Sequence, residues 1–253
     1  MAGLRAAGGR AFADIDLLVP RAKLPEVEAR LRTAGWQSEV VSDYDERYYR
    51  EWMHEIPPFR HPERQIEVDL HHTLAPLTGA IKVDAAPLFA AAAAVPGRAF
   101  RIPAPADLVL LSAVHLFYGG EFAHGFRDLS DIDLLMREFA ATDSGFWDAL
   151  LERADRLAMG RPLCYALRYN RRLLGTPIPD EVLARSASEL PGRAVLAAMD
   201  AIFEPALMPG RLVRPDGRTA TARGLLWLRS HGLKMPPGLL VYHAAQKAVQ
   251  TRQ

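Results

Sequence analysis

The sequence predicts an N-terminal α/β domain followed by an all-helical domain, and three observations lead to this fold class. Short runs of β-forming residues dominate the first hundred positions, namely FADIDLLV, WQSEVVSD and RQIEVDLHHTL. Beyond about residue 103, apolar residues recur at spacings of three and four, which is typical of helices. The proline- and glycine-bearing stretch VPGRAFRIPAPA lies between these regions. We therefore expect one domain at residues 1–102 and a second at 103–253.

The N-terminal region is expected to contain three β-like runs, the first two of which bracket one helix. Polar and apolar residues alternate in DIDLL at residues 14–18, and Pro20 ends that run. Residues 24–33 carry apolar side chains three and four apart and are followed by Gly35, which predicts a helix that ends there. The segment RQIEVDLHHTL at residues 64–74 repeats the strand-like alternation. The aromatic-rich segment DERYYREWMH, which lies between the helix and this strand, is expected to form an edge strand or a lid, with packing as the commoner reason for such a run.

The helical region is expected to begin with PADLVLLSAVHLFY at residues 105–118. Its first residues are proline and aspartate, which favour the first turn of a helix. Segments such as GTPIPD and MPPG separate several of the helices that follow. Further helices are expected at residues 128–140, 145–158, 161–174, 179–187, 191–204, 219–231 and 237–249.

Composition and charge exclude several classes of protein. The chain has 253 residues, of which 49% are apolar and 24% charged, ordinary values for a globular protein. A net charge of +1 gives no indication of nucleic-acid or membrane binding. No segment has the about 20 apolar residues of a membrane span. The single cysteine, Cys164, lies in an apolar helix-like segment, which predicts a buried structural thiol and a cytoplasmic location.

The pentapeptide DIDLL occurs twice, at residues 14–18 and 131–135. On a strand, residues two apart point to the same face and are separated by about 6.6–6.8 Å along the strand. Asp14 and Asp16 can therefore converge on one or two divalent ions. Two uncompensated acids side by side repel each other, and a bound cation removes that penalty.

The second copy lies in a helical pattern, where each residue turns by about 100°. Asp131 and Asp133 would then point to nearly opposite faces and cannot bind one ion together. We expect a structural role for this copy, with Asp133 in solvent and Asp131 paired with Arg127 at i,i+4.

A third carboxylate follows in the strand at residues 64–74, where Glu67, Asp69 and His71 share one face. Two acid-bearing strands fit a three-carboxylate site, and hard oxygen ligands favour Mg²⁺ or Mn²⁺. Asp69 is the candidate to bridge a metal and help deprotonate an attacking hydroxyl, with Glu67 and His71 as accessory residues. Acids that simply face solvent on an exposed sheet are the alternative.

With these residues the chain resembles the nucleotidyltransferase superfamily with the DNA polymerase beta-like fold, and more narrowly a bacterial family of uncharacterised nucleotidyltransferases. Members tend to carry an arginine shortly before DIDLLV, a helix ending in Gly-Trp or Gly-Tyr, an acid-Leu-His strand, a His-bearing helix and a helix with Asp-Ile. The matching features here are Arg10, TAGW at 33–36, VDLHHTL at 68–74, SAVHLF at 112–117 and LSDI at 129–132.

The resemblance implies a palm with a mixed sheet flanked by helices. It also implies that Asp14 and Asp16 bind catalytic Mg²⁺ (or Mn²⁺) ions and that Asp69 completes the triad. The implied reaction moves a nucleoside monophosphate from an NTP such as ATP to an acceptor and releases pyrophosphate. The acceptor would be a small molecule or a peptide, and the sequence does not name it.

In the superfamily a small-residue turn before the first aspartate holds the triphosphate through backbone N–H groups. Gly8, Gly9 and Arg10 are the nucleotide-binding candidates here, and four residues separate Gly9 from Asp14, a shorter spacing than usual. Part of the phosphate grip is therefore expected to be missing. This leaves two alternatives open, a catalytically degenerate nucleotidyltransferase-like protein that binds a nucleotide or a partner, and a partner-binding helical protein. Arg60 and Arg64 are further candidates for phosphate contacts.

Overall fold

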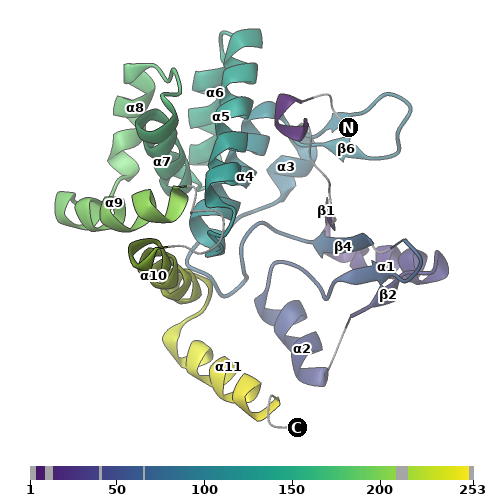
Figure 1. Cartoon of the computed structure of the whole chain (residues 1–253). Helices are drawn as coiled ribbons and strands as arrows, with labels where there is room; N and C mark the ends of the chain where they lie inside the picture. Colours follow the sequence, from purple (N-terminus) through teal and green to yellow (C-terminus); the bar gives the residue numbers. More distant parts are fainter. Residues whose placement is uncertain (1–3, 9–13, 40–41, 65, 209–215, 251–253) are drawn as a thin grey trace.

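The computed structural model describes residues 4–8, 14–39, 42–64, 66–208 and 216–250. Figure 1 shows a small sheet with its own helices beside a larger group of helices that follows it in the chain. None of the helices in this part of the chain combines the length and the hydropathy that a membrane span needs.

The main sheet has four strands in the order β1-β4-β3-β2 (Figure 1). Strand β1 runs parallel to β4, whereas β3 is antiparallel to both of its neighbours. The sheet is thus mixed, as the resemblance implies. Its strands are β1 (Asp14–Leu18), β2 (Gln37–Ser38), β3 (Phe59–His61) and β4 (Ile66–His71), and a separate two-stranded ladder joins β5 (Ala93–Ala94) to β6 (Arg101–Ile102).

One face of the main sheet is apolar and is covered by α1 (Leu24–Thr33). Val68 and Leu70 of β4 are buried on this face and pack with Leu24 at the start of α1. Because side chains alternate along a strand, the acids of β1 and β4 lie on the other face. The helix expected at residues 24–33 is confirmed. It covers the apolar face of the main sheet and not the face that carries these acids.

Residues 43–52 are helical, so the expectation of an edge strand in the aromatic segment was wrong. Helix α2 (Asp43–Arg47) continues into a π-helical turn, η3 (Tyr48–Trp52). Ser42 caps α2 by accepting a hydrogen bond from the backbone N–H of Asp45. Aromatic rings four residues apart form one stripe that packs against α11 (Pro237–Gln250). Residues four apart share one face on a helix and also on a strand, so this spacing alone does not distinguish the two.

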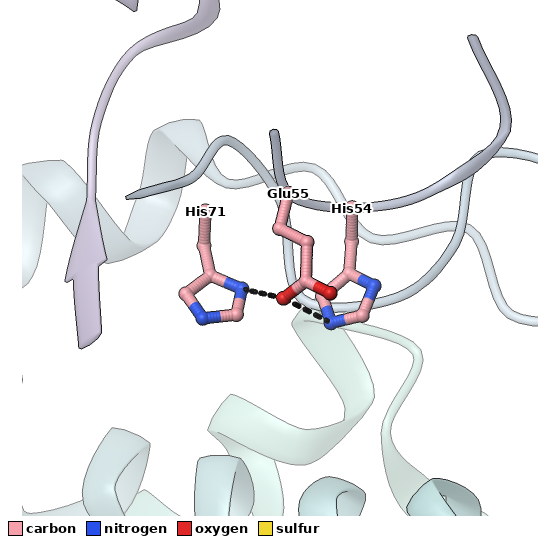
Figure 2. Close-up of side chains that lie close together, drawn as sticks. All are labelled: His54, Glu55 and His71. Atoms are coloured by element: carbon pink, nitrogen blue, oxygen red, sulfur yellow. Dashed lines mark ion pairs between the residues drawn. The ribbon is translucent and has the colours of Figure 1, made fainter. Parts of the chain in front are cut away.

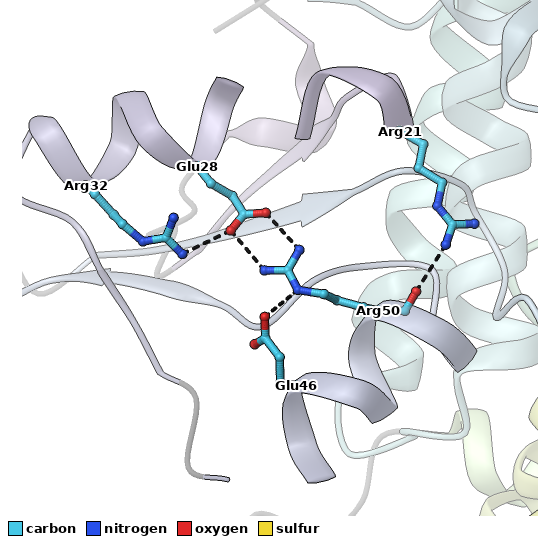
Figure 3. Close-up of polar contacts among 5 residues, drawn as sticks. All are labelled: Arg21, Glu28, Arg32, Glu46 and Arg50. Atoms are coloured by element: carbon cyan, nitrogen blue, oxygen red, sulfur yellow. Dashed lines mark hydrogen bonds and ion pairs between the residues drawn. The ribbon is translucent and has the colours of Figure 1, made fainter. Parts of the chain in front are cut away.

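An ion cluster around the buried Glu28 ties α1 to the α2–η3 segment (Figure 3). Glu28 of α1 accepts two hydrogen bonds from the guanidinium of Arg50, at 2.8 and 2.9 Å, and one from Arg32 at 3.0 Å. Arg50 is also paired with Glu46, and its carbonyl accepts a hydrogen bond from Arg21 at 3.3 Å. The Glu28 side chain is only 6% exposed, so solvent screens this contact weakly.

Replacing Glu28 by glutamine is expected to lower the free energy of unfolding by about 1–3 kcal/mol, because the Arg50 guanidinium loses its bidentate acceptor, the buried Glu28 carboxylate. Glu26→Gln on the same helix is the matched control, since its side chain is 48% exposed and exposed pairs contribute about 0–1 kcal/mol. Urea denaturation of the two variants measures the difference. Equal destabilisation by both substitutions would contradict the role given to Glu28.

Every helix expected beyond residue 103 is present in the described part of the chain. The structure begins or ends several of them a few residues from the expected positions, and residues 170–174 form a π-helical end to α7. The helices are α3 (Ala86–Ala91), α4 (Pro105–Gly119), α5 (Gly125–Thr142), α6 (Phe146–Arg156), α7 (Gly160–Tyr169), α8 (Asp180–Ser186), α9 (Arg193–Leu207), α10 (Gly217–Lys234) and α11 (Pro237–Gln250), with short turns η1 (Arg5–Ala7), η2 (Arg21–Lys23), η4 (Asn170–Leu174) and η5 (Ala187–Glu189).

The helices enclose the larger of the hydrophobic cores, in which Phe117, Tyr169 and Phe203 are almost fully buried. Ala85 and Leu88 are buried in the same core, although they precede the expected join between domains. The domain limits at 1–102 and 103–253 stay a prediction.

The second DIDLL copy lies on α5, as expected. Asp133, however, is not solvated as predicted, because its carboxylate accepts hydrogen bonds from Arg137 at 2.7 Å and Thr176 at 2.6 Å. It therefore joins α5 to the segment after α7. Cys164 is 2% exposed, and burial raises the pKa of its thiol to about 11, which confirms a buried structural cysteine.

Candidate functional site

The parallel pairing of β1 with β4 brings the predicted acids into adjacent rows. Asp14 stands opposite Glu67, and Asp16 stands opposite Asp69. Neighbouring strands lie about 4.8 Å apart, so the backbones of the two acid-bearing segments are next to each other. Asp14 and Asp16 are exposed, and Asp69 is half-buried.

Glu55 adds a fifth carboxylate to this surface. Its backbone pairs with that of His71 in an antiparallel bridge, and on either side Ile56 N–H donates to Leu70 at 3.0 Å and His72 N–H donates to His54 at 2.9 Å. We call the surface formed by Asp14, Asp16, Glu55, Glu67, Asp69 and His71 the acidic face.

Sequence reasoning missed Glu55 and His54. Both follow the aromatic helix directly, and no strand-like alternation surrounds them. The pairing that places Glu55 beside His71 is a single bridge, which leaves no periodic signal in the sequence.

Arg60 neutralises one edge of the acidic face. It stands opposite Glu67 on β3 and pairs with the Glu67 carboxylate at 2.9 Å and with Glu39 at 2.6 Å. Arg60 is thus engaged by two carboxylates, and its expected phosphate contact stays a prediction. Arg64 is exposed beyond the end of β3, and its phosphate contact also stays a prediction.

Asp69 lies among the negative charges of other carboxylates on the acidic face. Burial, together with the charges of Glu55, Glu67 and Asp16, raises the pKa of Asp69 to about 6. Asp16 is shifted the other way, because a hydrogen bond from His71 holds the pKa of its carboxyl below the ordinary value. Two carboxyl groups in facing positions thus differ in their affinity for protons, as expected for groups with different roles.

His71, at the end of β4, contacts both Asp16 and Glu55, and Figure 2 shows its contact with Glu55. Its Nε2 lies 3.2 Å from Asp16 Oδ1, and its Nδ1 lies 3.4 Å from Glu55 Oε2. Burial opposes the charged imidazolium, but the hydrogen bond to Asp16 and the nearby carboxylates outweigh it and raise the pKa of His71. Burial and the neighbouring His71 lower the pKa of His54 to about 3.

One set of three side chains in the described residues has its candidate ligand atoms within 4.8 Å of one another, and it consists of His54, Glu55 and His71 (Figure 2). Asp14, Asp16 and Asp69 do not form such a set, although their strands are in register. The Asp16 side chain is 74% exposed, and its Oδ1 lies 3.2 Å from His71 Nε2. The role of these three aspartates as metal ligands stays a prediction.

Of the nucleotide-binding candidates, Gly8 lies just after the short turn η1. Its backbone N–H donates to the Arg5 carbonyl at 3.0 Å, and the N–H of Arg5 donates to Glu138 of α5 at 2.9 Å. That N–H of Gly8 is therefore used within the turn, and nucleotide binding by Gly8 stays a prediction. Gly9 and Arg10 lie outside the described residues.

A mixed sheet with helices, followed by a helical region, is compatible with an α/β nucleotidyltransferase domain and a helical C-terminal part. The chain belongs to a family described as uncharacterised nucleotidyltransferase, whose family model matches residues 1–175. This finding confirms the resemblance drawn from the sequence and supports a general role in nucleotidyl transfer. No curated protein and no solved structure matches the chain.

Proposed function

We propose that this protein transfers a nucleoside monophosphate from an NTP to an acceptor hydroxyl and releases pyrophosphate, with Mg²⁺ or Mn²⁺ bound by Asp14, Asp16 and Asp69. The acceptor would be a small molecule or a peptide. The observation that carries this proposal is the parallel register of β1 and β4, which sets Asp16 opposite Asp69 on a face that the core does not cover.

The residues of the acidic face fit a divalent cation. Hard carboxylate oxygens from two adjacent strands are the donors that Mg²⁺ takes in proteins that bind substrate phosphates. Burial and the charges of Glu55, Glu67 and Asp16 together raise the pKa of Asp69, and a cation between the strands would offset these negative charges. A bound Mg²⁺ would also reduce the negative charge of the triphosphate as an acceptor approaches.

Asp69 is the proposed proton acceptor. Before a cation binds, its carboxyl group has a pKa of about 6, so it is ionised at neutral pH and can accept a proton from an acceptor hydroxyl. As the acceptor oxygen bonds to the α-phosphorus, the bond from that phosphorus to the bridging oxygen breaks, and pyrophosphate leaves with those electrons. The hydrogen bond from His71 holds the pKa of Asp16 below its ordinary value, so Asp16 serves as a ligand only, whereas Asp69 serves as both ligand and base.

Calorimetry with each NTP in turn, in Mg²⁺ and then in EDTA, tests this function without knowledge of the acceptor. We expect binding of at least one NTP to require Mg²⁺ and to weaken at least tenfold, about 1.4 kcal/mol, in Asp14→Asn. Glu26→Gln is the control, since it removes an exposed acid from α1 in the same part of the fold. The proposed use of the acidic face would be refuted if the NTP bound as strongly in EDTA as in Mg²⁺ and as strongly to Asp14→Asn as to the wild type.

A further inference from the structure

Figure 2 shows the imidazole rings of His54 and His71 both directed at the carboxylate of Glu55. Glu55 Oε2 lies 3.4 Å from His71 Nδ1 and 3.8 Å from His54 Nε2. Hydrogen bonds between nitrogen and oxygen are usually about 2.7–3.2 Å long. Both separations are therefore too long for good hydrogen bonds, although the two ring nitrogens approach the same carboxylate oxygen.

These separations match the spacing of ligands around a metal ion. Zinc binds histidine nitrogen and carboxylate oxygen at about 2.0–2.2 Å in tetrahedral geometry, which places neighbouring ligand atoms about 3.4 Å apart. Two histidines and one glutamate form a recognised donor set for zinc, with a fourth position left for water or substrate. Imidazole donors also favour zinc, cobalt and nickel over magnesium, so this set differs in chemistry from the carboxylates of β1 and β4.

The second ring nitrogen of His71 supplies an independent observation. Metal-binding histidines almost always direct their other nitrogen to a carboxylate, a backbone carbonyl or a water molecule, which fixes the tautomer and the ring orientation. His71 Nε2 lies 3.2 Å from Asp16 Oδ1, so Nδ1 is left to face Glu55 and His54. Asp16 therefore holds this ring in the orientation that a metal ligand needs.

The backbone holds the three residues together without a metal. Glu55 and His71 form a bridge, and the His54 carbonyl accepts a hydrogen bond from His72 N–H at 2.9 Å. The rings of His54 and His71 stack with centroids 5.2 Å apart. Their side chains are only 23% and 19% exposed. Only His71 stands on a strand, and these backbone hydrogen bonds fix the bend that carries His54 and Glu55 to the end of β4.

We propose that His54, Glu55 and His71 bind one transition-metal cation of the zinc class, at a site separate from the proposed Mg²⁺ site, with Asp16 as a positioning residue for His71. Because Asp16 contacts His71 and also stands opposite Asp69, this metal would fix a side chain of the nucleotidyl-transfer site.

Titration with Co²⁺ tests the proposal on the full chain after removal of metals with a chelator. Excess Mg²⁺ in the buffer occupies oxygen sites, and no NTP is present, so the readout does not depend on the proposed function. We expect one Co²⁺ per chain with a visible absorption band of tetrahedral or five-coordinate cobalt. His54→Ala and Glu55→Gln should each weaken Co²⁺ binding at least about 100-fold, and Asp16→Asn about 10–100-fold.

Two control variants distinguish this site from Co²⁺ binding elsewhere on the chain. His124→Ala removes an exposed histidine before α5, and Asp14→Asn removes an acid that does not contact the three ligands; both should bind Co²⁺ as the wild type does. Circular dichroism confirms folding, and His54→Gln replaces His54→Ala if the latter unfolds. Unchanged Co²⁺ affinity in Glu55→Gln, or an equal loss in Asp14→Asn, would overturn the proposal.

Discussion

Replacing Asp69 by asparagine is expected to remove nucleotidyl transfer and to stabilise the fold at the same time. Loss of a positioned general base alone lowers a rate constant by about 10²–10⁴-fold, and the proposed metal site loses a ligand as well. Asparagine keeps the shape of aspartate, so the acidic face should otherwise be preserved. Once an acceptor is identified, the turnover number can be measured as pyrophosphate release, and it should fall at least about 10²-fold.

The gain in stability follows from the sign of the pKa shift of Asp69. Its pKa rises from 3.8 to about 6 on folding, so the ionised carboxylate destabilises the folded chain above that pH. The penalty shrinks as pH falls through 6 and is absent below the unfolded value. A shift of about two units corresponds to about 3 kcal/mol, which solvent screening of a half-buried group reduces to about 1–2 kcal/mol.

Denaturation in EDTA measures this effect directly. At pH 8 the free energy of unfolding of Asp69→Asn should exceed that of the wild type by about 1–2 kcal/mol, and at pH 4 the two should agree within about 0.5 kcal/mol. Adding Mg²⁺ should stabilise the wild type and narrow the gap at pH 8. Glu26→Gln is the control and should change neither turnover nor this pH dependence. Wild-type turnover in Asp69→Asn would contradict the proposed catalytic role of Asp69. An unchanged free energy of unfolding at pH 8 would contradict the charge balance described for the acidic face.

The acidic face was predictable because its signal is local. Asp14 and Asp16 alternate with apolar residues, as Glu67, Asp69 and His71 do, and a period of two places each set on one side of a strand. The same alternation puts Val68 and Leu70 on the opposite side of the strand, where they are buried. Residue spacing alone did not predict that the two strands are neighbours. That step came from the family resemblance, because strand pairing depends on contacts far apart in the chain.

Other features were missed because their causes are not periodic. Glu55 reaches the acidic face through a single bridge to His71. An edge strand was one of the two forms expected for the aromatic segment. Its rings four residues apart instead lie on a helix that packs on α11. Asp133 was expected in solvent, but Thr176 and Arg137 bind it, and Thr176 comes from a segment whose position the sequence of α5 does not specify.

A buried ion pair in the helical core carries the largest expected effect on stability. Asp107, near the start of α4, is fully buried, and Arg153 of α6 is 13% exposed. The Arg153 guanidinium donates to the two carboxylate oxygens at 2.5 and 2.9 Å and to the Pro87 carbonyl at 2.6 Å. One side chain thus connects α4, α6 and α3 and satisfies the buried Asp107 carboxylate.

Arg153→Met is expected to lower the free energy of unfolding by about 3–5 kcal/mol, because it leaves the Asp107 charge buried without a partner. Arg156→Met on the exposed side of the same helix is the matched control and should change stability by less than about 0.5 kcal/mol. The double variant Asp107→Ala/Arg153→Met removes both charges and should be more stable than Arg153→Met alone, since the larger part of the loss comes from the unpaired carboxylate. Urea denaturation of the four proteins decides the matter: a double variant no more stable than Arg153→Met would mean that the loss reflects packing around the arginine rather than its charge.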